Sequence, residues 1–499
     1  MRRVLFKGSP RRIVSALGWL GLLYLAWWFL APPSPASSRS LDCKSSRHRS
    51  FNQVTLSGTP DTKSISQIWL SLETTFKAYA PVPKSLPHEP FTSQADFPPI
   101  EAIKNHTYIS KEDGRTTRDR HVTVVNELPE YPADIFNGRG IVMLAGGRYN
   151  GYAATGLGMI RETGSSLPVE VWMKDEPEEK KGWCKELEKE GMICRRLSDY
   201  IDVEFLKHGY QFKILTMLFS SFEQILFLDA DNVPVRNPDI VFESKRFIDT
   251  GAILWPDYWK HSGTPILPFV VGLADEASEI LRTEQTVESG QIVWDKKRHW
   301  KSLCLATYYN YYGPQYYYTL ITQGWAGWGD KDTFPTALKS LHEEYYMIPH
   351  KLETLFVNGT IEGIGMLQAD PSNQEEYEPL FLHSNIIKWN PREFLCVGCA
   401  SDKHDPVKAS FLEREESSIN RHLKEHRRIF NIEDMQKLNI DPEPLIWKSM
   451  EHNVCKSVWA NADLCIRTRE HMSNAFGYEF RSSRAFSLFG YGDQICISK

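Results

Sequence analysis

The chain has 499 residues, of which 24% are charged and 12% are aromatic, and its formal net charge is −5. This length allows about two or three domains. An acidic balance without a concentrated basic stretch offers no electrostatic footprint for nucleic acid. We therefore expect no nucleic-acid partner.

Cysteine usage favours an oxidising compartment. The chain has nine cysteines. Cys396-Val-Gly-Cys399 is not followed by a second pair of that spacing, so disulfides are favoured over a zinc site. Cys184 with Cys194, and Cys455 with Cys465, are close enough in sequence to pair, although the sequence does not determine the connectivity. The odd count leaves at least one cysteine without a partner in the same chain.

The N-terminus predicts a membrane anchor. Basic residues at positions 2, 3, 7, 11 and 12 precede an apolar run from Ile13 to Ala31. About 20 apolar residues span a bilayer, and a basic flank keeps its own end cytosolic. We expect a cytosolic tail at 1–12, a single transmembrane signal anchor at 13–31, and everything after it in the secretory lumen. A cleaved signal peptide is the alternative, which the Pro-rich segment 32–35 disfavours because it replaces a small-residue cleavage site.

The segment 32–133 is expected to be a stem. Ser and Pro dominate its beginning, and further Pro-rich turns follow. One amphipathic piece, Ser66 to Ala80, is compatible with a helix. We expect the stem to hold the catalytic part away from the membrane.

Regular alternation of strand and helix patterns occupies 134–400 and predicts an α/β domain. Such alternation is typical of a parallel sheet with helices on both faces. The segment 401–499 is expected to be a charged, Cys-containing extension of unassigned role. The expected strands are 140–145, 168–173, 192–196, 225–228 and 251–255, and the expected helices are 152–162, 183–190, 211–221, 301–310, 334–342 and 409–430.

Glycines follow the first expected strand, at Gly146-Gly147-Arg148. Glycines at such a position let backbone N–H groups approach a ligand closely. The dinucleotide fingerprint is absent, because the pair Gly156 and Gly158 lacks the third glycine. The turn is a weak indication of a nucleotide site, and a plain turn is the alternative.

The strand Ile225–Leu228 leads directly into Asp229-Ala230-Asp231, and Pro234 ends the segment. A short apolar run of this kind is typical of a strand buried on both faces, whose carboxyl end lies at the ligand crevice of an α/β protein. Two carboxylates one residue apart repel each other unless a cation lies between them. Oxygen ligands suit Mg²⁺ or Mn²⁺, which keep positions open for substrate phosphates. We predict a divalent metal that holds the diphosphate of a nucleotide-linked substrate, with a solvated turn as the alternative.

Two polar motifs between residues 288 and 332 suit sugar chemistry. The segment from Glu288 to Gln291 could recognise sugar hydroxyls or could be a turn. Asp330 follows a glycine-rich loop and could face the reacting sugar carbon, as a nucleophile or as an electrostatic stabiliser. We assign Asp332 to the N-cap of the following helix.

His383 and Lys388 complete the candidate site. A neutral imidazole is a normal third metal ligand beside carboxylates. Lys388 is a point charge suited to a diphosphate leaving group. The alternatives are a buried, hydrogen-bonded histidine and a solvated lysine.

Nine short motifs occur in a fixed order along about 135–395, and they are Gly146–Tyr149, Leu167–Val171, Phe227–Pro234, Leu254–Asp257, Glu288–Gln291, Tyr308–Asn310, Tyr316–Tyr318, Gly329–Phe334 and His383–Asn385. As an ordered set they resemble the fungal glycosyltransferase family 71 mannosyltransferases of the Golgi. Within that family the chain looks most similar to the α-1,2-mannosyltransferases that add branches to the outer chain of N-linked mannan. Trp325 and Trp328 depart from the smaller residues expected in their loop.

The resemblance implies a GT-A-like nucleotide-sugar-binding fold, GDP-mannose as donor and Mn²⁺ or a similar divalent cation as cofactor. It also implies a mannose-terminated glycan or mannan acceptor and transfer with retention of configuration. The implied metal ligands are Asp229, Asp231 and His383, the donor-binding residues are Gly146, Gly147, Arg148, Asp229 and Lys388, the catalytic residues are Asp330 and Glu288, and the acceptor-binding residue is Gln291.

We therefore expect a single-pass type II protein of the Golgi membrane that transfers mannose and forms an α-1,2 linkage. An α-1,3-mannosyltransferase, or a transferase that uses another nucleotide sugar, is the alternative among enzymes. An inactive lectin-like subunit of a mannan-synthesising complex is the alternative outside them.

Overall fold

The computed structural model describes residues 62–87, 106–175, 181–273, 285–325, 327–373, 375–395, 418–480 and 495–497. The expected cytosolic tail and membrane anchor lie outside these residues. Within the described part, no helix combines the length and the apolar character needed to cross a bilayer.

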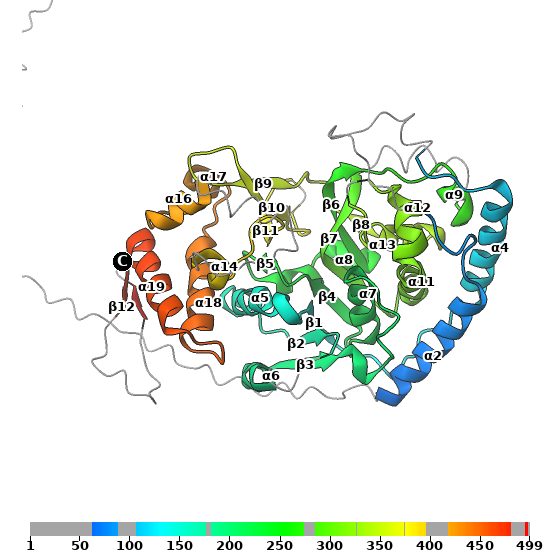
Figure 1. Ribbon diagram of the computed structural model, residues 1–499, viewed down its shortest axis with the longest axis horizontal. Helices are drawn as coiled ribbons and strands as arrows, with labels where there is room; N and C mark the ends of the chain where they lie inside the picture. Colours follow the sequence, from blue (N-terminus) through cyan, green and yellow to red (C-terminus); the bar gives the residue numbers. More distant parts are fainter. Residues whose placement is uncertain are drawn as a thin grey trace, which may run out of the picture.

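A seven-stranded mixed sheet forms the centre of the molecule, in the order β3-β2-β1-β4-β7-β6-β8 (Figure 1). The strands from β3 to β4 are parallel to their neighbours, whereas β7 is antiparallel to both β4 and β6. The expected α/β class is therefore correct, but the sheet is parallel only in part. The strands are β1 (Arg139–Leu144), β2 (Val169–Met173), β3 (Met192–Arg196), β4 (Gln224–Leu228), β6 (Ala252–Lys260), β7 (Gln285–Asp295) and β8 (Tyr346–Met347).

The helices between these strands begin and end close to their expected positions, because each carries an apolar face toward the sheet. The segment 409–430 is the exception: its residues 409–417 lie outside the described part, and the helix that follows ends at Lys424. The helices of the central part are α5 (Asn150–Glu162), α6 (Lys181–Lys189), α7 (Tyr210–Phe219), α8 (Lys245–Thr250), α9 (Leu267–Val270), α11 (Trp300–Tyr311), α12 (Tyr318–Thr322) and α13 (Thr333–Ser340).

A second, four-stranded sheet adjoins the carboxyl end of β4 and has the order β5-β11-β10-β9. Strand β5 (Asn232–Pro234) follows β4 after only three residues and pairs antiparallel with β11 (Pro379–His383), which places His383 opposite Asn232. The remaining strands are β10 (Gly363–Ala369) and β9 (Glu353–Phe356). This sheet brings a strand that is distant in sequence next to the Asp-x-Asp segment.

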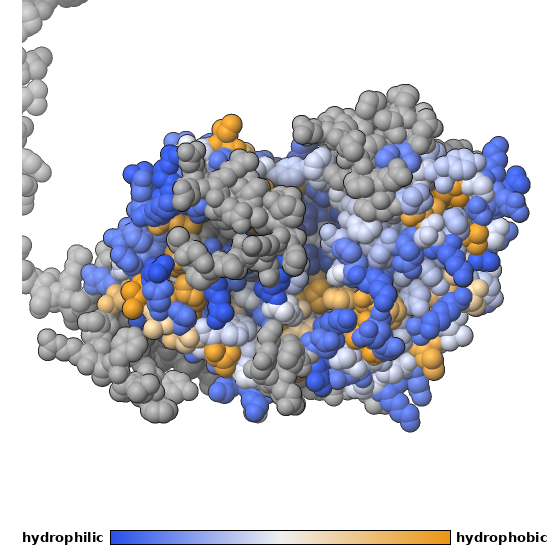
Figure 2. Space-filling model, viewed as in Figure 1, coloured by the Kyte–Doolittle hydropathy of each residue, from blue (hydrophilic) through white to orange (hydrophobic). Residues whose placement is uncertain are grey.

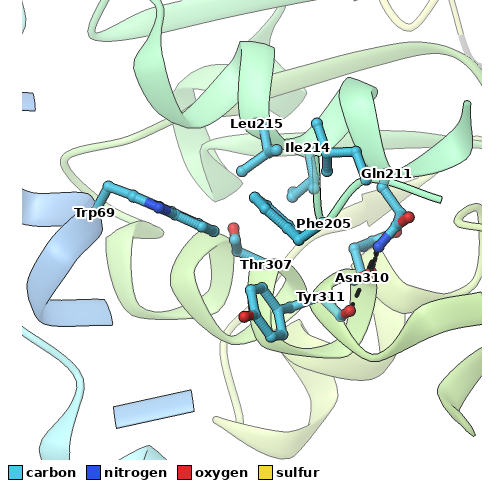
Figure 3. Close-up of a pocket in the computed structure, with 9 residues that line it drawn as sticks. Trp69, Phe205, Gln211, Ile214, Leu215, Thr307, Asn310 and Tyr311 are labelled. Carbon is cyan, nitrogen blue, oxygen red and sulfur yellow. Dashed lines mark hydrogen bonds between the residues drawn. The ribbon is translucent and has the colours of Figure 1, made fainter. Parts of the chain in front are cut away.

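The structure differs from the expected stem at residues 62–87 and 106–133. Helices α2 (Thr62–Ala78) and α4 (Lys111–Glu127) lie along one end of the molecule beside α11 and α12 (Figure 1). Trp69 of α2 is buried and stacks on Phe205 at a centroid distance of 5.5 Å. Figure 3 shows Trp69 at the edge of a pocket that it shares with side chains of α7 and α11. Because α2 buries its apolar face in the main core, this part of the chain belongs to the folded domain.

The C-terminal segment forms a helical unit at the opposite end (Figure 1). Helix α18 packs on α5, and Ser449 Oγ donates a hydrogen bond to Thr155 O at 2.9 Å. This contact ties the C-terminal unit to the helix that follows β1. The elements are α14 (Pro391–Leu395), α16 (Ser418–Lys424), α17 (Ile432–Lys437), α18 (Glu443–Cys455), α19 (Ala462–Phe476), β12 (Tyr478–Phe480) and β13 (Ile495–Ile497).

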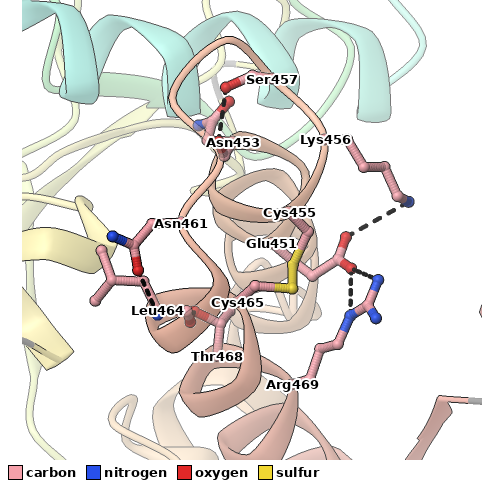
Figure 4. Close-up of a disulfide and its surroundings, with 10 residues drawn as sticks. All are labelled: Glu451, Asn453, Cys455, Lys456, Ser457, Asn461, Leu464, Cys465, Thr468 and Arg469. Atoms are coloured by element: carbon pink, nitrogen blue, oxygen red, sulfur yellow. Dashed lines mark hydrogen bonds and ion pairs between the residues drawn. A yellow bond between two sulfur atoms is a disulfide. The ribbon is translucent and has the colours of Figure 1, made fainter. Parts of the chain in front are cut away.

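Both disulfides considered from the sequence are present. Cys184–Cys194 joins α6 to β3, and Cys455–Cys465 joins the end of α18 to α19 (Figure 4). Among the described cysteines, Cys304 is a buried free thiol. The outer surface is largely hydrophilic on the face shown in Figure 2, with apolar residues in small separate groups.

Candidate active site

The Asp-x-Asp segment begins where β4 ends. The side chains from Ile225 to Leu228 are fully buried, and the chain then leaves the sheet at Asp229. The backbone there is held by a hydrogen bond from Asp229 N to Gly290 O at 2.8 Å. Ser384 N donates to Asp231 O at 3.0 Å, so β11 is anchored to the same segment. Both strands thus present polar side chains at one edge of the sheet.

Asp229, Asp231 and His383 come together at this edge. One potential ligand atom from each residue lies within 4.8 Å of the other two. Asp231 Oδ1 is 3.3 Å from His383 Nε2, and all three side chains are only partly buried. Two carboxylates and one imidazole in this arrangement suit a divalent cation such as Mg²⁺ or Mn²⁺.

Glu288 faces the other ring nitrogen of His383 and supports the same interpretation. Its Oε1 lies 2.9 Å from His383 Nδ1 and accepts a hydrogen bond from Gly290 N at 2.6 Å. In metal sites a histidine ligand usually turns its second nitrogen to a carboxylate, which orients the ring. The residues present therefore fit a metal ion bound through Nε2.

Two lysines complete the charge pairing. Lys388 forms an ion pair with Asp231 and donates to Ser384 O at 2.7 Å. The side chain of Lys213 of α7 is buried, and its Nζ lies 3.0 Å from Asp229 Oδ2 and 3.3 Å from Asp330 Oδ2. Lys213 therefore links Asp229, one of the three candidate metal ligands, to Asp330, the carboxylate expected near the sugar carbon.

Burial and the neighbouring charges shift the pKa values of these residues strongly. Burial raises the pKa of Asp229 to about 6, against the opposing effect of Lys213. Burial would also raise the pKa of Asp231, but Lys388 and His383 hold it well below its ordinary value. Burial would lower the pKa of His383, but Glu288 and Asp231 raise it to about 10. A cation at this site must therefore displace a proton from the imidazole.

Residues 138–370 match the family described as "Mannosyltransferase putative", in two overlapping parts, 138–282 and 275–370. These bounds include the Asp-x-Asp segment, Lys213, Glu288 and Asp330. We call this part of the chain, which is similar to that family, the mannosyltransferase segment. The match agrees with the family that the sequence motifs resemble.

Individual relatives carry the same description. The chain is 33% identical over 319 residues to the α-1,2-mannosyltransferase MNN5 of Saccharomyces cerevisiae, which covers 54% of each protein. It is 33% identical over 350 residues to the α-1,2-mannosyltransferase MNN21 of Candida albicans, covering 60% of this chain and 53% of the relative. The chain thus spans about half the length of the curated relatives it matches. Mouse xyloside xylosyltransferase 1 aligns with 42% of this chain and 84% of its own at 13% identity, with a TM-score of 0.28, which is too low to support an argument.

Within the mannosyltransferase segment, the segment Glu288 to Gln291 differs from its sequence interpretation. It is part of β7, paired with β4 and β6, and is neither a turn nor a sugar-facing loop. Gln291 is fully buried, and its Oε1 accepts a hydrogen bond from Asn232 Nδ2. The side chain of Gln291 lies beneath the site, and its role in acceptor binding stays a prediction. Glu288 contacts His383 and is placed to orient that ring, and its catalytic role also stays a prediction.

Asp330 and Asp332 lie just before α13 of the mannosyltransferase segment. Asp330 is 4% exposed and its charge is balanced by Lys213, while burial raises its pKa. Asp332 stands at the N-cap position but makes no capping hydrogen bond. Its Oδ1 accepts from Val287 N at 3.0 Å, so Asp332 holds the start of β7. The assignment of its side chain to the cap is therefore corrected.

The glycine turn of the mannosyltransferase segment lies at the carboxyl end of β1, the strand next to β4. Gly146 and Gly147 both have positive φ, which favours glycine. Arg148 is exposed, with its guanidinium 5.1 Å above the ring of Tyr149. The turn therefore lies at the same sheet edge as Asp229.

Lys213 was missed from the sequence. It lies in the apolar run of α7, between Phe212 and Ile214, where a sheet-facing position predicts an apolar residue. A single lysine inside such a run is the available signal, since a buried lysine requires acidic partners. Its partners, Asp229 and Asp330, come from segments distant in sequence.

Proposed function

We propose that the protein is an α-1,2-mannosyltransferase that moves mannose from GDP-mannose to a mannose residue of a glycan or mannan acceptor. The proposal includes a GT-A-like donor-binding fold, Mn²⁺ or a similar divalent cation, and retention of the α configuration. Its support is the family match together with relatives named α-1,2-mannosyltransferase.

The observation that carries the proposal is the cluster of Asp229, Asp231 and His383, with ligand atoms within 4.8 Å. These residues would hold the cation. A divalent cation supplies positive charge to the departing diphosphate. Several carboxylates beside a diphosphate would otherwise repel it.

The chain's own residues would then divide the work. Lys388, beside Asp231, would add a second positive charge at the leaving group. Arg148 and the glycine turn would border the nucleotide. Lys213 would hold Asp229 and Asp330 in place, and Asp330 would stabilise positive charge at the sugar carbon. In the transfer, the bond from that carbon to the GDP oxygen would break, a bond to the acceptor oxygen would form, and the proton of the acceptor hydroxyl would pass to the departing diphosphate.

We also propose that the protein is a single-pass type II protein of the Golgi membrane, with residues 13–31 as the anchor. The apolar composition of that segment and its basic N-terminal flank support this location. Two disulfides are compatible with a lumenal catalytic domain.

The test uses the full chain purified in detergent, GDP-mannose and α-1,2-mannobiose. We expect GDP release coupled to formation of a trisaccharide with a new α-1,2 linkage, determined by NMR. Activity should disappear after chelation and return with Mn²⁺. Asp231→Asn should reduce turnover at least about a thousandfold, as removal of a charge that acts in the transition state typically does. Transfer that persists after complete chelation would contradict the metal, and transfer from a different nucleotide sugar alone would contradict the donor.

A further inference from the structure

Aromatic side chains gather beside Asp330. Tyr210, the first residue of α7, is 41% exposed. It stacks on His208 with ring centroids 4.5 Å apart and an interplanar angle of 27°. The ring of Trp328 stands edge-on to His208 at 5.3 Å and to Tyr210 at 6.2 Å. We call these three residues, His208, Tyr210 and Trp328, the aromatic platform.

A buried tyrosine packs beneath the platform and holds its tryptophan in place, so the platform is a preformed surface. The fully buried Tyr318 meets Trp328 at 5.3 Å and an angle of 86°. Tyr318 in turn donates a hydrogen bond to Asn310 Oδ1 at 2.7 Å, which ties it to α11. A rigid aromatic surface loses little conformational entropy when a ligand covers it.

A series of contacts leads from Asp229, Asp231 and His383 to this platform. Lys388 and His383 both form ion-pair contacts with Asp231, and Lys213 contacts both Asp229 and Asp330. Gly329, next to Asp330, packs so closely on Tyr210 that a Cβ there would come within 3.1 Å of the ring. Burial, and next the charge of Asp330, raise the pKa of Tyr210. The contact of Gly329 with Tyr210 thus places the platform at the Asp330 end of the site.

We propose that the aromatic platform is the subsite that binds the mannose ring of the acceptor glycan. This inference rests on the proposed function. A pyranose has a face of C–H groups that packs on an aromatic ring and a rim of hydroxyls that needs donors and acceptors. Tyr210 supplies both an exposed ring and a hydroxyl. The platform lies beside Asp330, the carboxylate that the proposed function places near the reacting sugar carbon, so an acceptor ring on the platform would be close to that carbon.

The platform suits the acceptor better than the nucleotide. The glycine turn and Arg148, which suit a nucleotide, come from the β1 end of α5 and carry their own exposed aromatic residue, Tyr149. Tyr149 makes an edge-on contact with Tyr152 of α5 and is not part of the platform. Under this proposal Tyr149 would border the nucleotide and Tyr210 would contact the acceptor mannose.

The test compares Tyr210→Ala and Trp328→Ala with Tyr210→Phe and Trp328→Phe, which keep an aromatic ring. Trp459→Ala is the matched control, since Trp459 is also a half-buried tryptophan and meets Trp183 at 4.7 Å far from the site. The acceptor KM for α-1,2-mannobiose should rise about tenfold or more in the alanine variants, as expected when an aromatic anchor is lost. Their donor KM should stay within about twofold of the parent value, because a uniform structural defect would change both. The phenylalanine and control variants should keep the acceptor KM within about threefold.

Each outcome decides something. An unchanged acceptor KM in folded alanine variants, judged by thermal unfolding, overturns the platform, and a rise in donor KM alone assigns the rings to the nucleotide and also overturns it. If the parent chain transfers no mannose at all, the proposed function fails. Binding then decides the platform separately: saturation-transfer NMR of mannobiose should show contact of its C–H protons with aromatic protons in the parent, and its absence overturns the subsite. Should the alanine variants not fold, the same NMR measurement on Tyr210→Phe and the parent gives the decision.

Discussion

His383 lies between two carboxylates, and this arrangement decides which of its nitrogens can hold a cation. Glu288 faces Nδ1 at 2.9 Å, and Asp231 faces Nε2 at 3.3 Å. A ligating imidazole must leave the metal-bound nitrogen unprotonated, so the hydrogen of a ligating His383 would lie on Nδ1, which faces Glu288. Under the proposed function Glu288 would therefore favour the tautomer that binds the cation, without touching the cation itself.

This role gives a prediction for Glu288→Gln. The amide keeps the size and an acceptor oxygen but removes the negative charge that makes the imidazole more basic. We expect the affinity for Mn²⁺, measured by calorimetric titration, to fall about tenfold or more. Glu343→Gln is the matched control, because Glu343 lies 2.6 Å from Nδ1 of His299 in a similar pair away from the site. An equal affinity in the Glu288 variant and the parent would contradict the role.

At the scale of elements, the sequence predicted strands that are continuous apolar runs, but it did not predict a strand that polar residues interrupt. The run before Asp229 predicted β4, because four consecutive apolar residues can be buried only between two covered faces. The same reasoning missed β7, where Glu288, Ser289 and Gln291 interrupt the pattern with polar groups. Those residues are polar because they contact His383, Lys213 and Asn232. Such partners come from distant segments, so spacing along the chain cannot reveal them.

The site itself was predictable to a similar extent. Asp229 and Asp231 were named because they follow a buried strand, and the resemblance to the mannosyltransferase family implied His383 as the third ligand. Their proximity, however, depends on β5 pairing with β11, across about 150 residues of sequence. Lys213 was not predicted, because no feature of the neighbouring sequence distinguishes it from a chance interruption of an apolar helix.

The packing of α18 on α5 gives an element-scale prediction. Gly158 lies so close to α18 that an added Cβ would come within 2.0 Å of Ser449 Oγ and 2.9 Å of its Cβ. We expect Gly158→Ala to reduce the free energy of unfolding by about 1–3 kcal/mol, as overpacking typically does. Gly209→Ala is the control, since no atom lies within 4 Å of an added Cβ there and its φ is −58°. Urea unfolding should show a lower midpoint for Gly158→Ala only, and equal midpoints would refute this packing.

At the scale of the whole molecule, both ends of the described chain pack on the central sheet unit. Helix α2 buries Ile65, Trp69, Leu72 and Phe76 in the main core, at the spacing of one helical face. That face was visible in the sequence as an amphipathic piece, but the Pro-rich segments around it favoured a stem. Helical periodicity identifies a buried face without identifying what covers it. Here the cover is α11 and the tyrosine that follows it. Tyr311 of α11 donates a hydrogen bond to Glu73 Oε1 of α2 at 3.2 Å, and Tyr312 donates one to Phe76 O at 2.8 Å.

Helix α4 offers a test of this integration through pH. His121 of α4 is 1% exposed, and its Nε2 is 2.7 Å from Tyr309 Oη of α11. Burial lowers the pKa of His121 from 6.5 to about 4. Because the folded state holds the neutral form, its contribution is complete above pH 6.5 and is lost as the pH falls from 6.5 towards 4. At pH 5 the loss is about 2 kcal/mol.

We therefore expect the stability difference between the parent chain and His121→Gln to shrink by about 2 kcal/mol between pH 7 and pH 5. Glutamine cannot titrate, so only the parent loses this contribution on acidification. His452→Gln, at an exposed position of α18, is the control and should differ from the parent by the same amount at both pH values. Urea unfolding followed by tryptophan fluorescence provides the measurement. A difference for His121→Gln that does not change with pH would mean that α4 exposes this histidine, and that the N-terminal helices do not share the core.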